Sequence, residues 1–292
     1  MKLDLTQVHA LADRAEQAAL SAGELIARSS QQELEVRYKA GGDSLASQVV
    51  TEVDAQAQAL ILEELAPSFA AYDLALLTEE LADDGSRLVK DYFWCIDPLD
   101  GTLPFTQGIP GYGVSIALVR RDGEPMLGVI YDPVRQRLYR AVRGGGVQIN
   151  GSAWLAPKAP PANARLHVYG DCTFADDPDR AAVSADLQRR ATQLGYSGAV
   201  LTIGGGAVLN ACAVLEHPPA LYFKKPKPER GGGAAWDFAA TACLFNEAGA
   251  FARDFAGQRL ELNRPGDTFM NHCGVCYATD AKLARSLQLA SG

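Results

Sequence analysis

The chain has 292 residues, of which 48% are hydrophobic and 21% are charged. This composition is ordinary for a folded globular protein and excludes a collagen-like, coiled-coil or intrinsically disordered chain. The 35 acidic and 27 basic residues give a formal net charge of −8, which disfavours general binding to nucleic acid or to an anionic membrane. We therefore expect neither partner, and a local site would have to bind any anionic ligand.

The sequence also predicts where the protein is found. Its longest apolar stretches fall far short of the roughly 20 residues that a membrane-spanning helix needs. Asp4, Asp13 and Glu16 occupy the N-terminal segment, where a secretory signal would have a basic segment followed by an apolar run. We expect a cytoplasmic protein with reduced, buried cysteines. The Cys273–Cys276 pair has CxxC spacing but no second pair, which gives little support to a redox or zinc site.

The first half of the chain predicts helices followed by strands. Apolar residues at three- and four-residue intervals predict an amphipathic helix over 6–28. The run Thr51-Glu-Val-Asp54 resembles a capping box at the start of a second helix. Short apolar runs at 74–77 and 92–96 predict two strands that end at acidic residues. An antiparallel sheet is expected from three more strands, over 113–119, 126–131 and 138–142.

The second half predicts an alternation of helices and strands, which indicates an α/β unit. A segment rich in Pro and Ala at 150–164 is the best candidate for a domain boundary. We therefore expect an N-terminal α+β domain over 1–155 and a C-terminal α/β domain over 156–292. The predicted elements of the second domain are helices over 181–194, 207–215, 237–248 and 280–289 and strands over 199–203, 220–223 and 275–278.

The most specific local motif is Asp97-Pro-Leu-Asp100-Gly-Thr102, which directly follows an apolar run. Pro between the two carboxylates and Gly behind them indicate a rigid turn that directs both side chains to one point. A hard divalent cation takes such oxygen ligands and could also use the Leu99 carbonyl. Gly101 and Thr102 could offer backbone N–H groups to a phosphate. Ordinary turn chemistry explains the same dipeptides, so the motif alone leaves both interpretations open.

Further carboxylates stand at the ends of other predicted elements. Glu79 ends the preceding strand and Asp237 begins a helix. Two carboxylates about 4 Å apart repel by roughly 4 kcal/mol at an effective dielectric of 20, so a cluster of four would require cations. Two Mg²⁺ would cancel four charges and could assist in-line phosphoryl transfer. The alternatives are that Asp237 stabilises a helix N-terminus, that Asp54 caps a helix and that Glu79 lies in a solvated loop.

These residues belong to longer runs that resemble a known family. The first signature of the inositol monophosphatase family closely resembles 94–105 with its continuation over 108–118, and the second resembles 236–240 with 246–249. Thr78-Glu-Glu80 matches the acidic pair that precedes the first signature, and 50–54 matches the upstream helix start. The motifs occur in the family's order and at its approximate spacing over nearly the whole chain.

The resemblance implies a fold and an activity. The fold would be a layered αβαβα sandwich of the α/β (α+β) class, as in inositol monophosphatase and fructose-1,6-bisphosphatase, and usually a homodimer. The activity would be that of a Mg²⁺-dependent, lithium-sensitive phosphomonoesterase. Most of the metal ligands would lie in the N-terminal domain, and the C-terminal domain would supply Asp237 and the substrate pocket.

The resemblance also implies roles for individual residues. One metal would be bound by Glu79, Asp97 and the Leu99 carbonyl, and a second by Asp97, Asp100 and Asp237, with Asp54 near a weaker third site. Glu79 and Thr102 would orient and deprotonate the attacking water, and Asp100 is expected among the catalytic residues with them. The expected substrate-binding residues are Gly101, Thr102, Gly205, Gly206, Ala207, Lys224, Lys225 and Asp237, although 204–206 is also consistent with a plain loop.

The substrate is less well defined, because the chain departs from the family pattern at Leu103 and Pro104. Arg230 stands where the resemblance places an acidic residue that binds inositol hydroxyls. The basic run 223–230 could bind a second phosphate or could be a solvated loop. We expect hydrolysis of an inositol, sugar or polyol monophosphate. The alternatives are a 3′(2′),5′-bisphosphate nucleotidase acting on 3′-phosphoadenosine 5′-phosphate, and a regulatory binding protein that retains the phosphatase fold.

Overall fold

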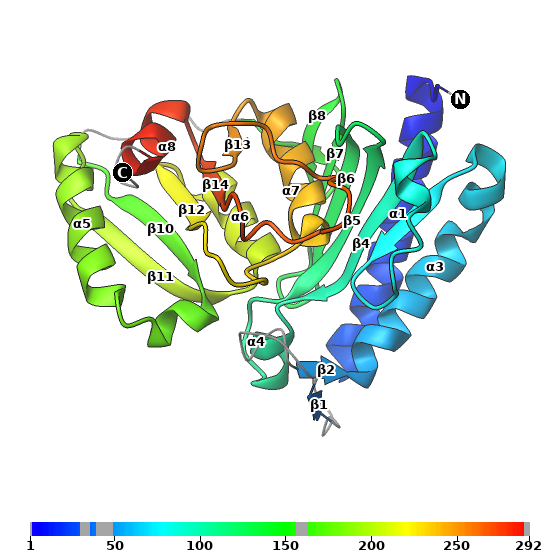
Figure 1. Cartoon of the computed structure of the whole chain (residues 1–292), viewed down its shortest axis with the longest axis horizontal. Coiled ribbons are helices and arrows are strands. Elements are labelled where there is room, and N and C mark those ends of the chain that lie inside the picture. Colours follow the sequence, from blue (N-terminus) through cyan, green and yellow to red (C-terminus); the bar gives the residue numbers. More distant parts are fainter. Residues whose placement is uncertain (1, 30–35, 39–48, 156–162, 289–292) are drawn as a thin grey trace.

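The computed structural model describes residues 2–29, 36–38, 49–155 and 163–288. Layers of helices and sheets alternate from one side of the molecule to the other: helices, sheet, helices, sheet, helices (Figure 1). This arrangement confirms the predicted αβαβα sandwich. A small sheet of β1 (Val36–Tyr38) and β2 (Val49–Thr51) lies with α4 (Thr102–Thr106) at the lower end of the molecule in Figure 1.

The first helical layer consists of α1 (Leu5–Ser29) and α3 (Glu52–Tyr72), which pack side by side. Their buried faces carry apolar residues at helical spacing, including Leu11, Ala18 and Ile61, each at most 1% exposed. These residues share one apolar core with the sheet beneath them. Both predicted helices are therefore confirmed, whereas the side chain of Thr51, expected to cap α3, lies outside the described side chains.

The first sheet has its strands in chain order, and most neighbours are antiparallel. The strands predicted over 113–119, 126–131 and 138–142 are antiparallel, which confirms that expectation. The exception is β3, which runs parallel to β4. Layers of helices cover both faces, which explains why its central strands are buried along almost their full length. The strands are β3 (Ala75–Thr78), β4 (Tyr92–Asp100), β5 (Gly113–Arg120), β6 (Pro125–Asp132), β7 (Arg137–Val142), β8 (Gly146–Ile149) and β9 (Ser152–Ala153).

The central layer consists of α6 (Ala207–Glu216) and α7 (Ala235–Ala248). Helix α7 lies close against the first sheet, because a Cβ atom at Gly128 of β6 would overlap the carbonyl oxygen of Ala240. This approach holds the N-terminal turn of α7 beside the end of β4. The apolar core around the two helices includes residues of both sheets, among them Phe93 and Tyr222.

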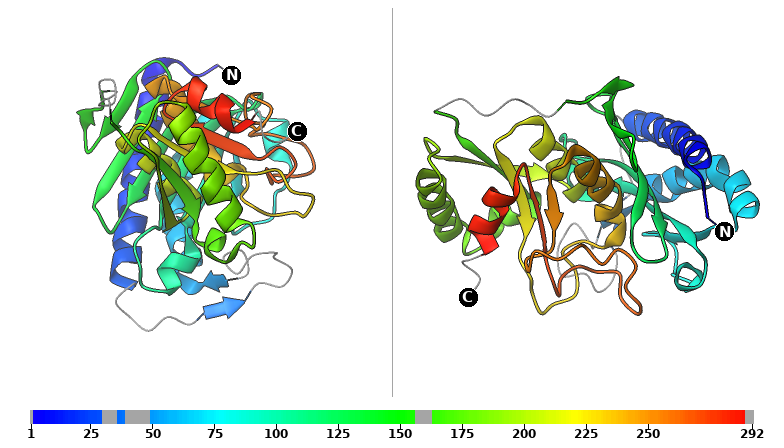
Figure 2. Two further views of the ribbon diagram at one scale, coloured as in Figure 1. Left: turned by 90° about the vertical axis from the view of Figure 1, so that its left-hand side faces the viewer. Right: turned by 90° about the horizontal axis from the view of Figure 1, so that it is seen from above.

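The second sheet has the order β11-β10-β12-β14-β13, with β10 parallel to β11 and β12. Helices α5 (Arg180–Gln193) and α8 (Ala281–Gln288) form the outermost layer (Figure 2). The sequence did not predict β10, β13 or β9. The strands are β10 (Leu166–Asp171), β11 (Ala199–Gly205), β12 (Ala220–Lys224), β13 (Phe251–Arg253) and β14 (Val275–Ala278).

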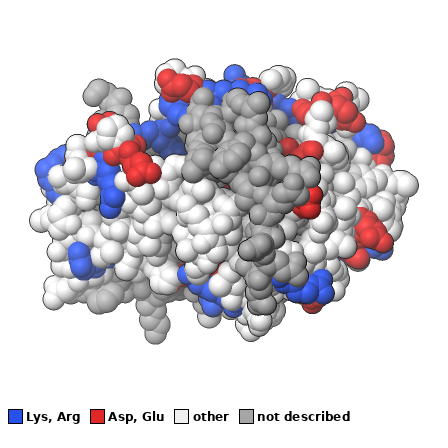
Figure 3. Space-filling model, turned by 90° about the horizontal axis from the view of Figure 1, so that it is seen from below, with Lys and Arg blue, Asp and Glu red and all other residues white. Residues whose placement is uncertain are grey.

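Two further expectations concern the chain as a whole. The division into domains at residue 155 stays a prediction, and most of the Pro/Ala-rich segment around it lies outside the described residues. None of the described helices is both long enough and apolar enough to cross a membrane. Basic and acidic side chains are intermixed on the face seen from below (Figure 3).

Candidate metal centre

Asp97 and Asp100 lie at the end of β4, where the ladder with β5 is irregular between them. Both carboxylates are buried, at 1% and 5% exposure. Asp97 Oδ1 accepts a hydrogen bond from the Leu99 amide at 3.0 Å, which closes the turn. Gly101 then has φ 84°, and a Cβ atom there would lie 2.6 Å from the Gly111 carbonyl oxygen. Only glycine therefore allows the strand to turn so sharply into α4.

Asp100 is fixed from the other side by the N-terminus of α6. Its two carboxylate oxygens accept hydrogen bonds from the Ala207 amide at 3.1 Å and the Val208 amide at 2.9 Å. These are the first amides of the helix, which have no partner within it and favour a negative charge. The second half of the chain thereby holds a carboxylate of the first half in place.

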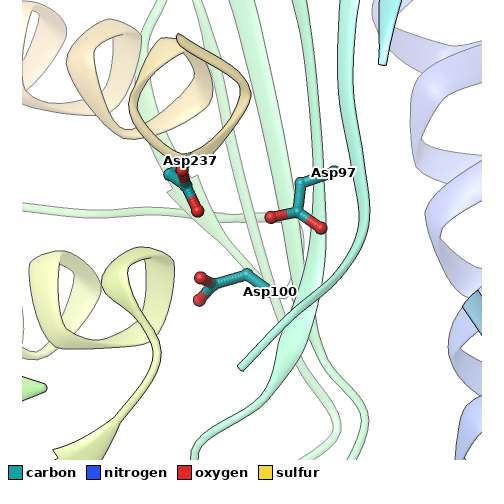
Figure 4. Close-up of side chains that lie close together, drawn as sticks. All are labelled: Asp97, Asp100 and Asp237. Carbon is teal, nitrogen blue, oxygen red and sulfur yellow. The ribbon is translucent and has the colours of Figure 1, made fainter. Parts of the chain in front are cut away.

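Asp237 completes a cluster of three carboxylates. It lies in the first turn of α7, and its Oδ2 accepts a hydrogen bond from the Ala234 amide. Asp97, Asp100 and Asp237 each offer an oxygen atom within 4.8 Å of the others, and their side chains point toward one another (Figure 4). No second cluster of this kind occurs in the described part of the chain.

The electrostatics of the cluster favour a cation. Burial and the repulsion from Glu79 and Asp237 raise the pKa of Asp97 well above its ordinary value. Burial and Asp237 likewise raise the pKa of Asp100. Asp97 Oδ2 is buried and has no hydrogen-bond partner among the described residues. Because buried polar atoms are nearly always paired, this unpartnered oxygen fits a metal ligand.

A cavity of about 450 Å³ opens onto the cluster. Asp54 and Lys225 are the expected site residues that do not line it. Asp54 is buried on α3, where its charge contributes to the raised pKa of Asp97, and Lys225 is exposed beside a neighbouring cavity. The expected residues that line the cavity are Glu79, Asp97, Leu99, Asp100, Gly101, Thr102, Gly205, Gly206, Ala207, Lys224 and Asp237.

The sequence did not predict Asp171, which also lines this cavity. Asp171 ends β10, and its Oδ2 forms an ion pair with Lys224 Nζ at 2.8 Å. Its Oδ1 accepts hydrogen bonds from Tyr222 at 2.9 Å and Asn210 at 3.2 Å. A carboxylate two residues after the short run Leu166-His-Val-Tyr169 was the available signal, and it was missed because no strand was predicted there.

The basic run 223–230 is neither one solvated loop nor one continuous patch. Lys224 lies in the cavity wall, whereas Lys225 is exposed. The guanidinium of Arg230 lies 4.5 Å from the centre of the Phe269 ring and forms an ion pair with Asp267 at 3.3 Å. Phe269 lines the cavity, which places Arg230 at its outer edge.

Comparisons with known proteins agree with this geometry. The model of the inositol monophosphatase family matches residues 7–291. The Nus factor SuhB of Escherichia coli (strain K12) is 31% identical over 261 residues, which cover 86% of this chain and 87% of SuhB. Inositol monophosphatase 2 of Solanum lycopersicum is 28% identical over 251 residues, which cover 86% and 89%.

Solved structures show the same fold. A crystal structure of an IMPase/NADP phosphatase complexed with NADP and Ca²⁺ has a TM-score of 0.71 and 19% sequence identity, over 100% of this chain and 99% of that one. At this identity the likeness concerns the fold alone. The family match over nearly the whole chain shows that the protein belongs to the inositol monophosphatase family and is a phosphoric monoester hydrolase.

Proposed function

We propose that this protein is a Mg²⁺-dependent phosphatase that hydrolyses a small phosphomonoester, such as an inositol, sugar or polyol monophosphate. The observation that carries the proposal is the cluster of the buried Asp97 and Asp100 with the half-buried Asp237, together with the unpartnered Asp97 oxygen. Three carboxylates so close together in a buried site are stable in their ionised form only with a neutralising partner. Oxygen ligands alone select a hard cation such as Mg²⁺.

The donor set fits two cations. Glu79, Asp97 and the Leu99 carbonyl would bind one, and Asp97, Asp100 and Asp237 the other, with a weaker third site near Asp54. Bound cations would neutralise the carboxylates and supply a water of lowered pKa and a stabilised leaving oxygen.

The protein's own groups would orient the reactants. Glu79 is half-buried at the cavity wall, where it would accept the proton of the attacking water. Thr102 Oγ1 lies 3.3 Å from the Leu99 carbonyl oxygen, and its hydroxyl would align that water. The first amides of α6 already donate hydrogen bonds to Asp100, so they would hold a metal ligand in place and would not bind the phosphate. The backbone N–H groups of Gly101 and Thr102, in the turn into α4, would bind the phosphate instead.

Two alternatives have specific support. Lys224 in the cavity wall favours a bisphosphate nucleotidase, for which it would bind a second phosphate. Similarity to a Nus factor favours a regulatory binding protein that retains the phosphatase fold and acts through a protein partner. Inhibition by Li⁺, a homodimer and a cytoplasmic location stay predictions.

The test is a phosphate-release screen with Mg²⁺, with and without Li⁺, over inositol phosphates, sugar phosphates and nucleoside bisphosphates. Asp100→Asn should lower the release by at least about a hundredfold and weaken Mg²⁺ binding measured by calorimetry. Asp176→Asn, at an exposed carboxylate outside the cavity, is the matched control. Failure of the wild-type protein to bind Mg²⁺, or full activity of Asp100→Asn, would refute the proposal. Recovery of a stoichiometric transcription partner in the absence of any activity would favour the regulatory alternative.

A further inference from the structure

Two polar side chains are buried between the first helical layer and the first sheet. Thr78 is the last residue of β3 and Gln58 lies on α3, at 2% and 6% exposure. The Thr78 hydroxyl donates a hydrogen bond of 2.6 Å to Gln58 Oε1. The core around them is apolar and includes Ile61 and Ile96. An apolar pair of the same shape would be at least as stable in such a core, so packing alone does not account for these two residues.

The Thr78–Gln58 hydrogen bond lies between two carboxylates that are expected at the metal centre. Glu79 directly follows Thr78 and lines the metal-site cavity. Asp54 lies one helical turn before Gln58 on α3. The charges of Glu79 and Asp54 both contribute to the raised pKa of Asp97, so both carboxylates lie near it. The bond therefore joins α3 to β3 at the point where each element carries a carboxylate of the site.

The direction of the Thr78 side chain determines that of Glu79. Successive side chains of a strand point to opposite faces of the sheet. Thr78 points toward α3, and so does Ile96, its partner in register on β4. Glu79 and Asp97 are the next residues, and both line the cavity on the other face, together with Asp237 of α7. A hydrogen bond that holds Thr78 against α3 thus keeps Glu79 directed into the cavity.

The backbone alone constrains this end of β3 weakly. The strand has four residues and, among the described strands, pairs only with β4. Beyond its end, the Glu79 amide donates a hydrogen bond of 3.3 Å to the Ile96 carbonyl, which is long for an N–H···O bond. The chain then leaves the sheet in a turn. The side chain of Thr78 is therefore the anchor directly before Glu79.

We propose that Thr78 and Gln58 are positioning residues of the metal centre, whose hydrogen bond holds the Glu79 carboxylate where it binds a cation and orients the attacking water. Without this bond, Glu79 would move away from the cation, which would weaken metal binding and slow the chemical step. The turn at Gly101 and Thr102 would still bind the phosphate, so substrate binding would change little. This inference rests on the proposed phosphatase function and adds two residues that line neither the metal site nor the substrate site.

The test compares two substitutions of Thr78. Thr78→Val keeps the shape of the side chain and removes the hydroxyl, whereas Thr78→Ser keeps the hydroxyl. Thr78→Val should weaken Mg²⁺ binding measured by calorimetry about fivefold or more and lower kcat about tenfold or more. KM for the phosphomonoester that the wild-type protein hydrolyses fastest should change less than about twofold. Thr78→Ser should keep all three values within about twofold of the wild type.

A double-mutant cycle shows whether Thr78 acts through Gln58. Gln58→Met removes the acceptor and keeps a side chain of similar length, so it should reproduce the effects of Thr78→Val on Mg²⁺ affinity and kcat. The double variant should be no more impaired than either single variant, because all three lose the same hydrogen bond.

Ser68 provides a matched structural control. Its Oγ accepts a hydrogen bond of 2.9 Å from Trp94 Nε1, so it also joins α3 to the first sheet, nearer the C-terminal end of the helix. Ser68 is 1% exposed and does not line the metal-site cavity. Ser68→Ala and Thr78→Val should both lower the midpoint of urea denaturation, since each leaves a buried polar group unpaired. Ser68→Ala should leave Mg²⁺ affinity and kcat within about twofold of the wild type.

The outcomes separate this inference from the proposed function. If Thr78→Val leaves Mg²⁺ affinity and kcat as Ser68→Ala does, if Thr78→Ser is as impaired as Thr78→Val, or if the losses in the double variant add, the inference is overturned while the phosphatase activity stands. If the wild-type protein binds Mg²⁺ but releases no phosphate, the proposed function fails, and the Mg²⁺ affinities of the variants alone decide the inference. A wild-type protein that binds no Mg²⁺ would overturn both.

Discussion

The backbone of Gly206 lies directly against the carboxylate of Asp100. A Cβ atom at position 206 would overlap Asp100 Oδ2, although φ −69° at this residue is accessible to any amino acid. The Gly206 amide donates a hydrogen bond to the Gly111 carbonyl at 2.7 Å, and the next two amides bind Asp100 itself. The backbone at residue 206 therefore cannot shift away from the carboxylate, and only glycine, which lacks a Cβ atom, fits at this position.

Gly206→Ala should displace Asp100 from its position opposite Asp97. We expect Mg²⁺ affinity and kcat to fall by about tenfold or more, and the free energy of unfolding to fall by about 1–3 kcal/mol. Calorimetric titration with Mg²⁺, steady-state kinetics and chemical denaturation measure these effects. Gly145→Ala is the control, because a Cβ there would lie 3.2 Å from the Val142 carbonyl oxygen, far from the site. Wild-type metal affinity in Gly206→Ala would contradict the steric argument.

Thr102 and Thr106 allow a matched test of the hydroxyl at the site. Both belong to α4, and each hydroxyl lies near the carbonyl oxygen three residues earlier, at 3.3 Å and 2.9 Å. Only Thr102 lines the metal-site cavity. If its hydroxyl aligns the attacking water, Thr102→Ala should lower kcat by about a hundredfold, whereas Thr106→Ala should lower it less than twofold. Equal kcat values for the two variants would show that α4 matters only structurally.

The sequence predicted the part of the site that local chemistry determines. The turn from Asp97 to Thr102 depends on Pro98 between the two carboxylates and on Gly101 directly behind them, and the structure has this turn at the end of β4. The approach of Asp237 depends on the packing of α7 against β6 through Gly128, which no local pattern reveals. Only the resemblance to a family indicated that the two segments meet.

The second sheet was harder to predict, and the reason is physical. Strand β10 follows the Pro/Ala-rich segment and contains His167 and Gly170, which interrupt an apolar pattern. Its strand conformation is stabilised by two parallel neighbours, β11 and β12, that come later in the chain. Asp171 was missed with it, because its place in the cavity wall depends on which strand ends lie side by side.

The carboxylate cluster should make the metal-free protein more stable at acidic pH than at neutral pH. Burial, with repulsion from neighbouring carboxylates, raises the pKa values of Asp97, Asp100 and Asp237 in the folded state above the ordinary value of 3.8. The folded state then binds more protons than the unfolded state between 3.8 and the raised values. The contribution of the cluster to the free energy of unfolding therefore rises as the pH falls through the raised pKa values, and is complete near pH 3.8.

Denaturation in EDTA at a series of pH values between about 4 and 8 measures this effect. Asp97→Asn should flatten the dependence, because it removes one of the repelling charges, and should stabilise the metal-free protein at neutral pH. Saturating Mg²⁺ should raise stability most at neutral pH, where the carboxylates bind it in their ionised form. Asp176→Asn should leave the pH dependence as it is in the wild type. If the free energy of unfolding of the metal-free protein instead rises between about pH 4 and 8, the carboxylates of the cluster do not have raised pKa values.

The ion pair of Lys224 and Asp171 should stabilise the protein even without substrate. Asp171, Asp237 and Asp100 raise the pKa of Lys224 against the opposing effect of burial, so its contribution is fully present at neutral pH and is lost only above the ordinary value of 10.5. Lys224→Met removes the partner of a largely buried carboxylate and should lower the free energy of unfolding at pH 7 by about 1–3 kcal/mol. Lys225→Met, at an exposed side chain, should change it by less than about 0.5 kcal/mol.

Because Lys224 also offsets the charges of Asp100 and Asp237, its loss should steepen the pH dependence of the metal-free protein. Equal stability of the two variants in urea denaturation would mean that the ion pair contributes nothing measurable.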